Sequence, residues 1–169
     1  MKPKATLILR ASLDGEKSLY RDIEISASQS LYVLAEAIVM AFGFDFDHAF
    51  GFYSGLTPTQ LMRKNPRYEL FGDMGDASPG VVSVKKTKIS QAFPATGHAM
   101  MFLFDYGDDW RFHVKLTATG TQLPKVRYPR VIATAGAAPP QYPDADDIGD
   151  DAPTFGVDPV TGKRITFGR

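Results

Sequence analysis

The stretch Phe102-Leu-Phe-Asp-Tyr-Gly-Asp-Asp-Trp-Arg-Phe-His-Val-Lys-Leu116 decides the fold of this chain. Residues 99–104 are continuously apolar, which predicts a strand that is covered on both faces. Residues 105–109, Asp-Tyr-Gly-Asp-Asp, have the composition of a tight turn. The strand that follows alternates with a period of two and points its apolar residues inward. These residues are Trp110, Phe112, Val114 and Leu116. The stretch therefore predicts a β-hairpin at the centre of the fold.

A second hairpin is predicted at the N-terminus. Residues 5–13 and 19–25 alternate between apolar and polar side chains, and Asp14-Gly15 between them suits a tight reversal. Apolar residues then recur at helical spacing over residues 31–42, with Ser28 or Ser30 as the cap and Gly43 as the end. We expect this helix to be the one main helix and to pack on the hairpin.

The rest of the chain is less periodic. We predict a short strand that starts near His48, a long loop over about 54–80, and a short helical turn over 88–93. Residues 128–132 are expected to add an edge strand. The predicted fold class is α+β, a single roll-like domain with a mixed or antiparallel sheet. This domain is expected to span residues 1–143, followed by an acidic tail rich in proline and glycine over 144–169.

Composition excludes several classes of protein. The chain has 169 residues, no cysteine and a formal net charge of zero, so disulfides and thiolate metal sites are excluded. The apolar runs are too short for a membrane span, and a cytoplasmic location is expected. Lys85, Lys86 and Lys88 form the one local basic cluster, interpreted as a solvated strand edge or loop. Nucleic acid is therefore a weaker partner than protein or a second copy of the chain.

The acidic turn is the densest group of chemistry-bearing residues. Asp105, Asp108 and Asp109 could hold a divalent cation, with His48 brought in from elsewhere. Aspartates are also common in tight turns, where they accept from nearby backbone amides, and this structural interpretation is favoured. Close-spaced histidine ligands are absent from the sequence, and Tyr53 stands where a nucleophile elbow would need serine. We expect no cofactor, and metal ligation by Asp105, Asp108 and His48 is the minor alternative.

Four segments, in order, resemble the plasmid pRiA4b ORF-3-like family. Residues 102–110, Phe-Leu-Phe-Asp-Tyr-Gly-Asp-Asp-Trp, are similar to its Tyr-Asp-Phe-Gly-Asp-x-Trp signature. Residues 20–25, Tyr-Arg-Asp-Ile-Glu-Ile, take the place of its Trp-Arg-Arg-Ile strand. Residues 31–48 resemble its helix followed by Phe-Gly-Trp and a histidine. Residues 128–143 resemble its closing Tyr-Pro and Gly-x-x-x-Pro-Pro element.

The resemblance implies an α+β roll-like fold and says little about activity, because members are largely uncharacterised. Some members occur on plasmids or with insertion elements, which implies an association with mobile DNA. The candidate binding residues carried over from the signature are His48, Asp105, Tyr106, Gly107, Asp108 and Trp110. Many members have two further histidines at positions that are Phe50 and Phe112 here. A metal site in relatives would therefore be depleted in this chain.

We favour a non-catalytic binding or interaction module, because no catalytic constellation is present and the aromatic residues of 44–53 could line a groove. Two alternatives stay open. One is a metal-assisted hydrolase that uses the Asp105–Asp109 turn and His48. The other is a structural, dimerising domain that pairs through an exposed edge strand.

Overall fold

The computed structural model describes residues 2–73, 78–142, 154–157 and 164–167. The chain divides into two compact units, Met1–Ala138 and Pro139–Arg169, and each is described by itself. The predicted boundary between residues 143 and 144 lies outside the described residues. The second unit holds an antiparallel pair of strands, β9 (Thr154–Val157) and β10 (Arg164–Phe167), which the composition of the tail did not indicate.

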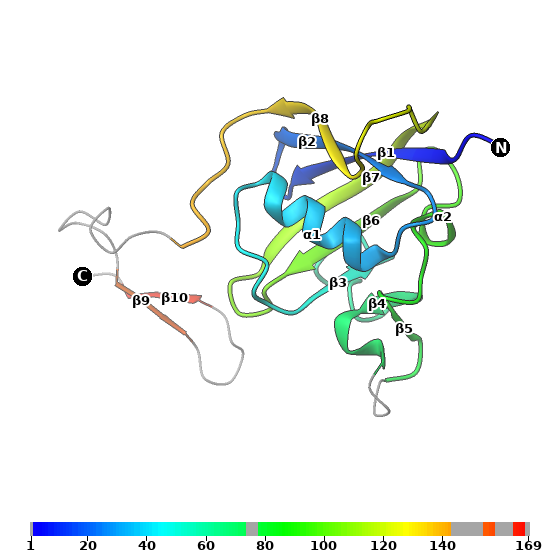
Figure 1. The fold of residues 1–169 in the computed structure, drawn as a ribbon. Helices are drawn as coiled ribbons and strands as arrows, with labels where there is room; N and C mark the ends of the chain where they lie inside the picture. The colour runs from blue at the N-terminus through cyan, green and yellow to red at the C-terminus, as the bar shows by residue number, and fades with distance from the viewer. Residues whose placement is uncertain (1, 74–77, 143–153, 158–163, 168–169) are drawn as a thin grey trace. The chain divides into compact units, whose positions relative to one another are not determined.

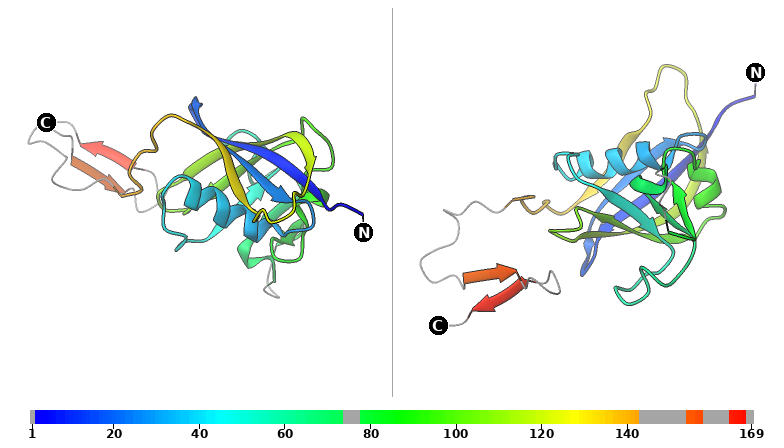
Figure 2. Two further views of the ribbon diagram at one scale, coloured as in Figure 1. Left: turned by 45° about the horizontal axis from the view of Figure 1, so that its top comes forward. Right: turned by 90° about the horizontal axis from the view of Figure 1, so that it is seen from below.

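The first unit is built on one eight-stranded sheet with the order β5-β4-β3-β6-β7-β1-β2-β8 (Figure 1). All neighbouring strands are antiparallel except β4 and β5, so the sheet is mixed. The strands are β1 (Ala5–Leu13), β2 (Glu16–Ser26), β3 (Phe50–Tyr53), β4 (Arg67–Glu69), β5 (Val81–Ser83), β6 (Ala99–Phe104), β7 (Trp110–Thr121) and β8 (Arg130–Ala135). Helix α1 (Leu31–Ala41) covers one face of this sheet (Figure 2). The α+β fold class is confirmed.

The central hairpin is confirmed as β6 and β7, with Phe104 opposite Trp110 and Phe102 opposite Phe112. Alternate residues of β6 are buried on opposite faces of the sheet. Phe102 belongs to the main core beneath α1, whereas Met101 and Leu103 form a small cluster on the other face. Tyr53 and Leu61 complete that cluster. The continuous apolar run therefore correctly predicted a strand that is covered on both faces.

The N-terminal hairpin and the main helix are also confirmed. Gly15 has a φ of 84° in the β1–β2 turn. Ser30 caps α1, and its Oγ accepts from the Val33 amide at 3.4 Å. The helix ends where Gly43 adopts a φ of 74° and the Phe44 amide donates to the Val39 carbonyl at 3.0 Å. A glycine in the left-handed conformation, followed by a residue whose amide donates back to the carbonyl five residues earlier, is a common way for a helix to end.

Two predicted segments differ from the structure. The loop expected over 54–80 contains β4 and the 3₁₀ helix η1 (Leu70–Asp73), and β5 follows it at the sheet edge. Strands of three residues between prolines and glycines are too short to show a period of two. The opposite edge strand occurs, but it spans Arg130–Ala135 rather than 128–132. The predicted helical turn is present as α2 (Ile89–Ala92).

Candidate functional site

The turn between β6 and β7 is organised around the carboxylate of Asp105. Its Oδ1 accepts from the amides of Gly107, at 3.1 Å, and Asp108, at 3.2 Å. Its own amide donates to the Ala49 carbonyl at 2.9 Å, and its carbonyl accepts from the Asp109 amide at 2.7 Å. Asp105 and Asp109 both have φ near 60°, a conformation that aspartate tolerates better than most residues. Asp105 thus has the turn-forming contacts that its residue type favours.

The structure brings His48 to this turn. Its Nε2 lies 3.3 Å from Oδ2 of Asp105 and 3.4 Å from Oδ1 of Asp47. The Asp105 carboxylate is buried, while the His48 ring is partly exposed and meets Phe104 edge-on. Within the described part of the chain, no group of three histidine, aspartate or glutamate side chains is placed to hold a metal ion. His48 and Asp105 therefore form a pair that fixes the loop before β3 to the turn after β6.

Tyr106 enters a separate hydrogen-bond chain on the sheet face opposite α1. Its hydroxyl lies 2.8 Å from that of Tyr53, and the Tyr53 hydroxyl donates to Glu69 at 3.0 Å. Burial, together with the Tyr106 hydroxyl and the Glu69 charge, raises the pKa of Tyr53 well above its ordinary value. Burial likewise raises the pKa of Tyr106. Both hydroxyls are therefore neutral donors that link the turn to β3 and β4.

Trp110 begins β7 at the rim of the core. Its ring packs on Phe44 with centroids 4.7 Å apart, and the side chain is half-buried rather than fully enclosed as the alternation predicted. The indole Nε1 is buried and has no hydrogen-bond acceptor among the described residues. Next to it, Arg111 lies 3.6 Å from both Asp14 and Asp109. Trp110 thus contributes packing to the fold, without a polar contact of its own.

The expected aromatic groove is not present at residues 44–53. Phe44, Phe50, Phe52 and Tyr53 are all buried, because β3 lies inside the sheet between β4 and β6. Phe50 and Phe112, which the family resemblance aligns with histidines, are also enclosed in the core beneath α1, and Phe46 is partly buried against it. The aromatic residues of this segment therefore stabilise the fold and do not line a groove.

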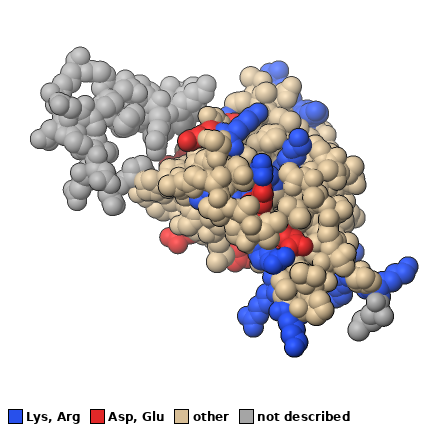
Figure 3. Space-filling view, turned by 90° about the horizontal axis from the view of Figure 1, so that it is seen from above, with Lys and Arg blue, Asp and Glu red and all other residues tan. Residues whose placement is uncertain are grey.

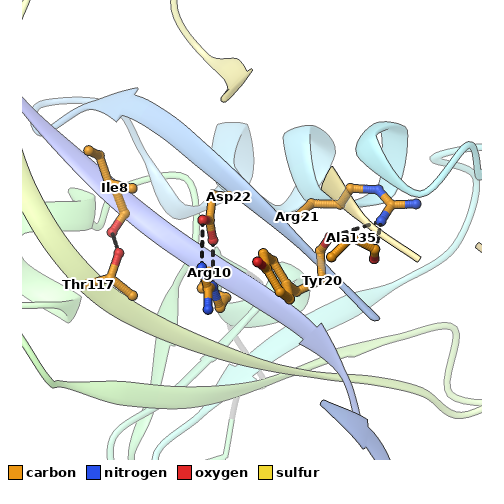
Figure 4. A network of polar contacts seen from close by, with 7 residues as sticks. All are labelled: Ile8, Arg10, Tyr20, Arg21, Asp22, Thr117 and Ala135. Carbon is orange, nitrogen blue, oxygen red and sulfur yellow. Dashed lines mark hydrogen bonds and ion pairs between the residues drawn. The ribbon is translucent and has the colours of Figure 1, made fainter. Parts of the chain in front are cut away.

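Arg21 is a buried arginine that joins three elements. Its Nε donates to the carbonyl of Ala41 at 3.1 Å, and its guanidinium also donates to the carbonyls of Tyr20 and Ala135 at 2.9 and 3.0 Å (Figure 4). Ala41 is the last residue of α1, where exposed carbonyls carry partial negative charge. The guanidinium also lies over the Phe42 ring, 4.8 Å from its centroid. Arg21 thus ties β2 to the end of α1 and to β8.

Arg10 and Asp22 form a two-pronged ion pair on the opposite face of the sheet. Arg10 Nε lies 2.8 Å from Asp22 Oδ1, and a terminal guanidinium nitrogen lies 2.9 Å from Oδ2 (Figure 4). The same guanidinium stacks 3.7 Å from the centroid of the Tyr20 ring. The hydrogen bond to Asp22 raises the pKa of Arg10, which is protonated in any case. This arrangement joins β1 to β2 and uses both oxygens of the Asp22 carboxylate.

A hollow of about 250 Å³ lies between α1 and β8. Ile23, Ala37, Ala41 and Pro129 line it, together with Met40 and Val131, whose side chains are 64% and 47% exposed. Ile132 follows on β8 with 43% exposure and has no partner in the register with β2. Arg130 also lines the hollow, but its guanidinium is paired with Glu24 at 2.7 Å. The hollow therefore presents an apolar surface with its one lining charge already neutralised.

The residues of this hollow do not form a local pattern in the sequence. One signal was present, because Met40 is a long apolar side chain that stands outside the spacing of the buried helix positions. Its neighbours in the hollow come from β2 and from residues 129–131, which only the sheet order brings beside α1. The contact of Arg21 with Ala135 depends on the same pairing of β2 with the distant strand β8.

Comparisons with known proteins agree with the fold. A crystal structure of a protein of unknown function, MM3350 from Methanosarcina mazei Go1, matches with a TM-score of 0.65 and 22% sequence identity. The match covers 83% of this chain and 74% of that chain. The search of the curated proteins found no match. The model of the family described as plasmid pRiA4b ORF-3-like protein matches residues 5–150. With its fold, its β6–β7 turn and this match, the chain belongs to the plasmid pRiA4b ORF-3-like family.

Proposed function

We propose that this protein is a non-catalytic interaction module that binds a partner polypeptide at the hollow between α1 and β8. The observation that carries this proposal is the exposure of Met40 and Val131 at one apolar concavity, with the exposed Ile132 next to Val131 on β8. Exposed apolar side chains are ordinary when they are scattered, but a group that surrounds a hollow is typical of binding surfaces. Methionine adapts its shape to a ligand at little cost, which suits Met40 to this role.

The lining also specifies the chemistry of the partner. Apolar walls with a paired arginine favour an uncharged apolar side chain over a charged one. A volume of about 250 Å³ suits one bulky anchor residue rather than a whole small-molecule ligand. The partner is therefore a polypeptide with an exposed leucine, isoleucine, methionine or phenylalanine at its centre of contact.

Charge supports protein over nucleic acid as the partner. The formal net charge is zero. Figure 3 shows basic and acidic side chains interspersed over one face, without a broad field of either sign among the coloured residues. Binding to a phosphate backbone relies on a clustered basic surface. A neutral, mixed surface instead leaves apolar contact as the main source of affinity.

The metal-assisted hydrolase has weaker support. One oxygen of Asp105 already accepts two backbone amides and the other faces His48, so this carboxylate has little capacity left for an ion. Neither Asp105 nor His48 lines the α1–β8 hollow, so that hollow offers a substrate no place beside the turn. An interaction module therefore explains the exposed apolar hollow, whereas a metal-assisted hydrolase does not.

Selection from a library of peptides displayed on phage tests the proposal. We expect peptides with a single bulky apolar anchor to be enriched on the wild-type protein. Their affinity should fall at least about tenfold in Met40→Glu, because the carboxylate would be desolvated against an apolar partner. Met62→Glu is the matched control, since Met62 is 53% exposed and lies outside the hollow. Equal affinity for both variants would contradict the proposal.

The dimerising domain remains a second candidate, favoured by the position of Met40 beside the hollow. In a two-fold contact, Met40 of each copy would insert into the hollow of the other, as self-complementary interfaces require. Sedimentation velocity at several concentrations checks this. A dimer that is lost in Met40→Glu and kept in Met62→Glu assigns the hollow to a second copy. A monomer throughout removes this candidate and leaves binding of another polypeptide to the peptide selection.

No helix among the described residues is long and apolar enough to cross a membrane. We infer that the protein acts in the cytoplasm and is associated with mobile genetic elements, as the family resemblance implies. Fractionation of cells that express the tagged full chain tests the location, and recovery of the protein mainly with membranes would contradict it.

A further inference from the structure

A second hollow, of about 370 Å³, lies where three distant segments meet. They are the start of β1, the connection from β2 to α1, and the start of α2. Backbone hydrogen bonds hold them together. The Ala27 amide donates to the Ala5 carbonyl at 3.0 Å, and the Ser90 amide donates to the Ala27 carbonyl at 3.2 Å. Main-chain hydrogen bonds therefore hold the three segments of this hollow in place, and the exposed side chains of Lys4, Ser28, Lys88 and Ser90 extend from them.

Two cationic side chains line the hollow, Lys4 from the β1 segment and Lys88 from the α2 segment. None of the described residues that line it is acidic. In contrast to Arg130 in the other hollow, neither lysine lies within 4 Å of a carboxylate oxygen among the described residues. A protein with zero net charge thus concentrates two positive charges around one concavity, which favours an anion there.

Three serines supply hydroxyl groups to the same hollow: Ser26, Ser28 and Ser90. The Ser26 and Ser28 hydroxyls lie 3.1 Å apart, so one of them donates to the other. The hydroxyl that accepts in this pair keeps its own proton for a further acceptor. Ser26 is buried and Ser28 is exposed, so the pair reaches from the protein interior to the surface of the hollow. The hydroxyls and ammonium groups together can donate several hydrogen bonds to one oxyanion.

We propose that this hollow binds the phosphate group of a small phosphorylated ligand. A phosphate offers several acceptor oxygens and negative charge, which match hydroxyl donors flanked by two lysines. Its volume lies in the lower part of the range for small-molecule sites. The site is separate from the α1–β8 hollow, with which it shares no lining residue. It gives a module without a catalytic constellation a means of sensing a metabolite.

Titration of the ¹⁵N-labelled full chain with inorganic phosphate tests the proposal, with sodium chloride exchanged to hold ionic strength constant. We expect saturable shifts of the amides of residues 26–28 and 88–90. In the double variant Lys4→Gln/Lys88→Gln the dissociation constant should rise at least about tenfold, because both charged donors are lost. The matched control is Lys64→Gln/Lys125→Gln, which removes the same charge from exposed lysines outside the hollow.

Loss of binding in the first double variant alone confirms the site. No saturation in the wild type, equal weakening in both double variants, or shifts centred on other residues would each overturn it. Equal weakening would mean that overall charge, and not this hollow, attracts phosphate. A second titration with glycerol 3-phosphate distinguishes the sources of the group. Tighter binding than inorganic phosphate assigns an organic phosphate, and weaker binding assigns the free ion.

Discussion

At the scale of single residues, the polar and aromatic side chains of the signature at residues 102–110 make contacts that stabilise the fold. Asp105 closes its turn through two amides, Tyr106 reaches Tyr53, and Trp110 packs on Phe44. Each of these residues connects the β6–β7 turn to a different neighbour. The turn therefore positions elements around the central hairpin, and its aspartates have the role that their frequency in tight turns predicts.

Arg21 is expected to be the most sensitive charged residue. Arg21→Ala should lower the free energy of unfolding by about 2–4 kcal/mol, since it removes a buried guanidinium and leaves partly buried carbonyls at the end of α1 and on β8 without their donor. Urea unfolding followed by circular dichroism measures this loss. Arg127→Ala, at an exposed arginine, should change stability by less than about 0.5 kcal/mol. Similar losses in the two variants would contradict the role assigned to Arg21.

Two substitutions at Trp110 distinguish the contribution of ring packing from that of hydrogen bonding. Trp110→Phe should change the free energy of unfolding by less than about 1.5 kcal/mol, because the indole N–H has no acceptor to lose. Trp110→Ala should cost about 3 kcal/mol, because it removes the ring that packs on Phe44. Thermal and urea unfolding of both variants provide the comparison. A loss in Trp110→Phe as large as that in Trp110→Ala would contradict this account, because an aromatic ring would still pack on Phe44 and the lost N–H would have to explain the difference.

His113 gives stability a dependence on pH. Burial, followed by the charges of Lys17 and Lys115, lowers its pKa in the folded protein, while Asp14 acts in the opposite direction. The neutral ring is thus favoured by folding, so its contribution is complete above the unfolded pKa of about 6.5 and is lost as the pH falls below that value. His113→Gln should reduce the dependence of the free energy of unfolding on pH below about 6.5.

Urea unfolding at a series of pH values from about 7.5 to 5 covers the range around the unfolded histidine pKa. His98→Gln serves as the control for the loss of a histidine. A slope between these pH values that is the same in the wild type and His113→Gln would argue against a lowered pKa at His113.

At the scale of elements, periodic segments were predictable and short ones were not. The β1–β2 hairpin, α1 and the β6–β7 hairpin have enough residues for the period of two or 3.6 to appear, and each is found. Strands β4 and β5 have three residues each and depend on pairing with one another and with β3. Sequence alone therefore cannot separate them from loop, because tertiary contacts decide their conformation.

The same limit applies to the candidate sites. The turn aspartates and His48 were recognisable by residue type, and their approach to one another follows from β3 and β6 being neighbours. The Phe44–Tyr53 aromatics were misassigned to a groove, because a run of aromatic residues does not tell which sheet position its strand occupies. Both hollows combine residues more than 80 positions apart, so neither has a local pattern.

The end of α1 depends on Gly43. Gly43→Ala should lower the free energy of unfolding by about 1 kcal/mol, because a φ of 74° is strained for a residue with a Cβ atom. No described atom lies within 4 Å of that Cβ, so steric crowding adds nothing. Gly43→Asn should cost less, since asparagine tolerates this conformation. Equal stability of Gly43→Ala and the wild type, measured by urea unfolding, would exclude strain at this position.

At the scale of the whole first unit, the two faces of the sheet differ, because the face opposite α1 combines a small apolar cluster with paired polar side chains. The α1 face holds the main apolar cluster, and the opposite face carries the Arg10–Asp22 and Tyr53–Tyr106–Glu69 contacts. The polar groups of that face are largely paired with one another. Exposed apolar side chains instead gather where the edge strand β8 passes α1, which makes this junction the surface best suited to a partner.

Methyl NMR of the protein labelled at the ε-carbons of its methionines tests this central claim most directly. Met40 lies at the α1–β8 hollow and Met62 is similarly exposed elsewhere, so each reports on its own surface. When a peptide selected on the wild-type protein is added, we predict a saturable change in the Met40 methyl signal and an unchanged Met62 signal. A Met40 signal that stays fixed while the peptide binds would contradict the assignment of this hollow as the binding site.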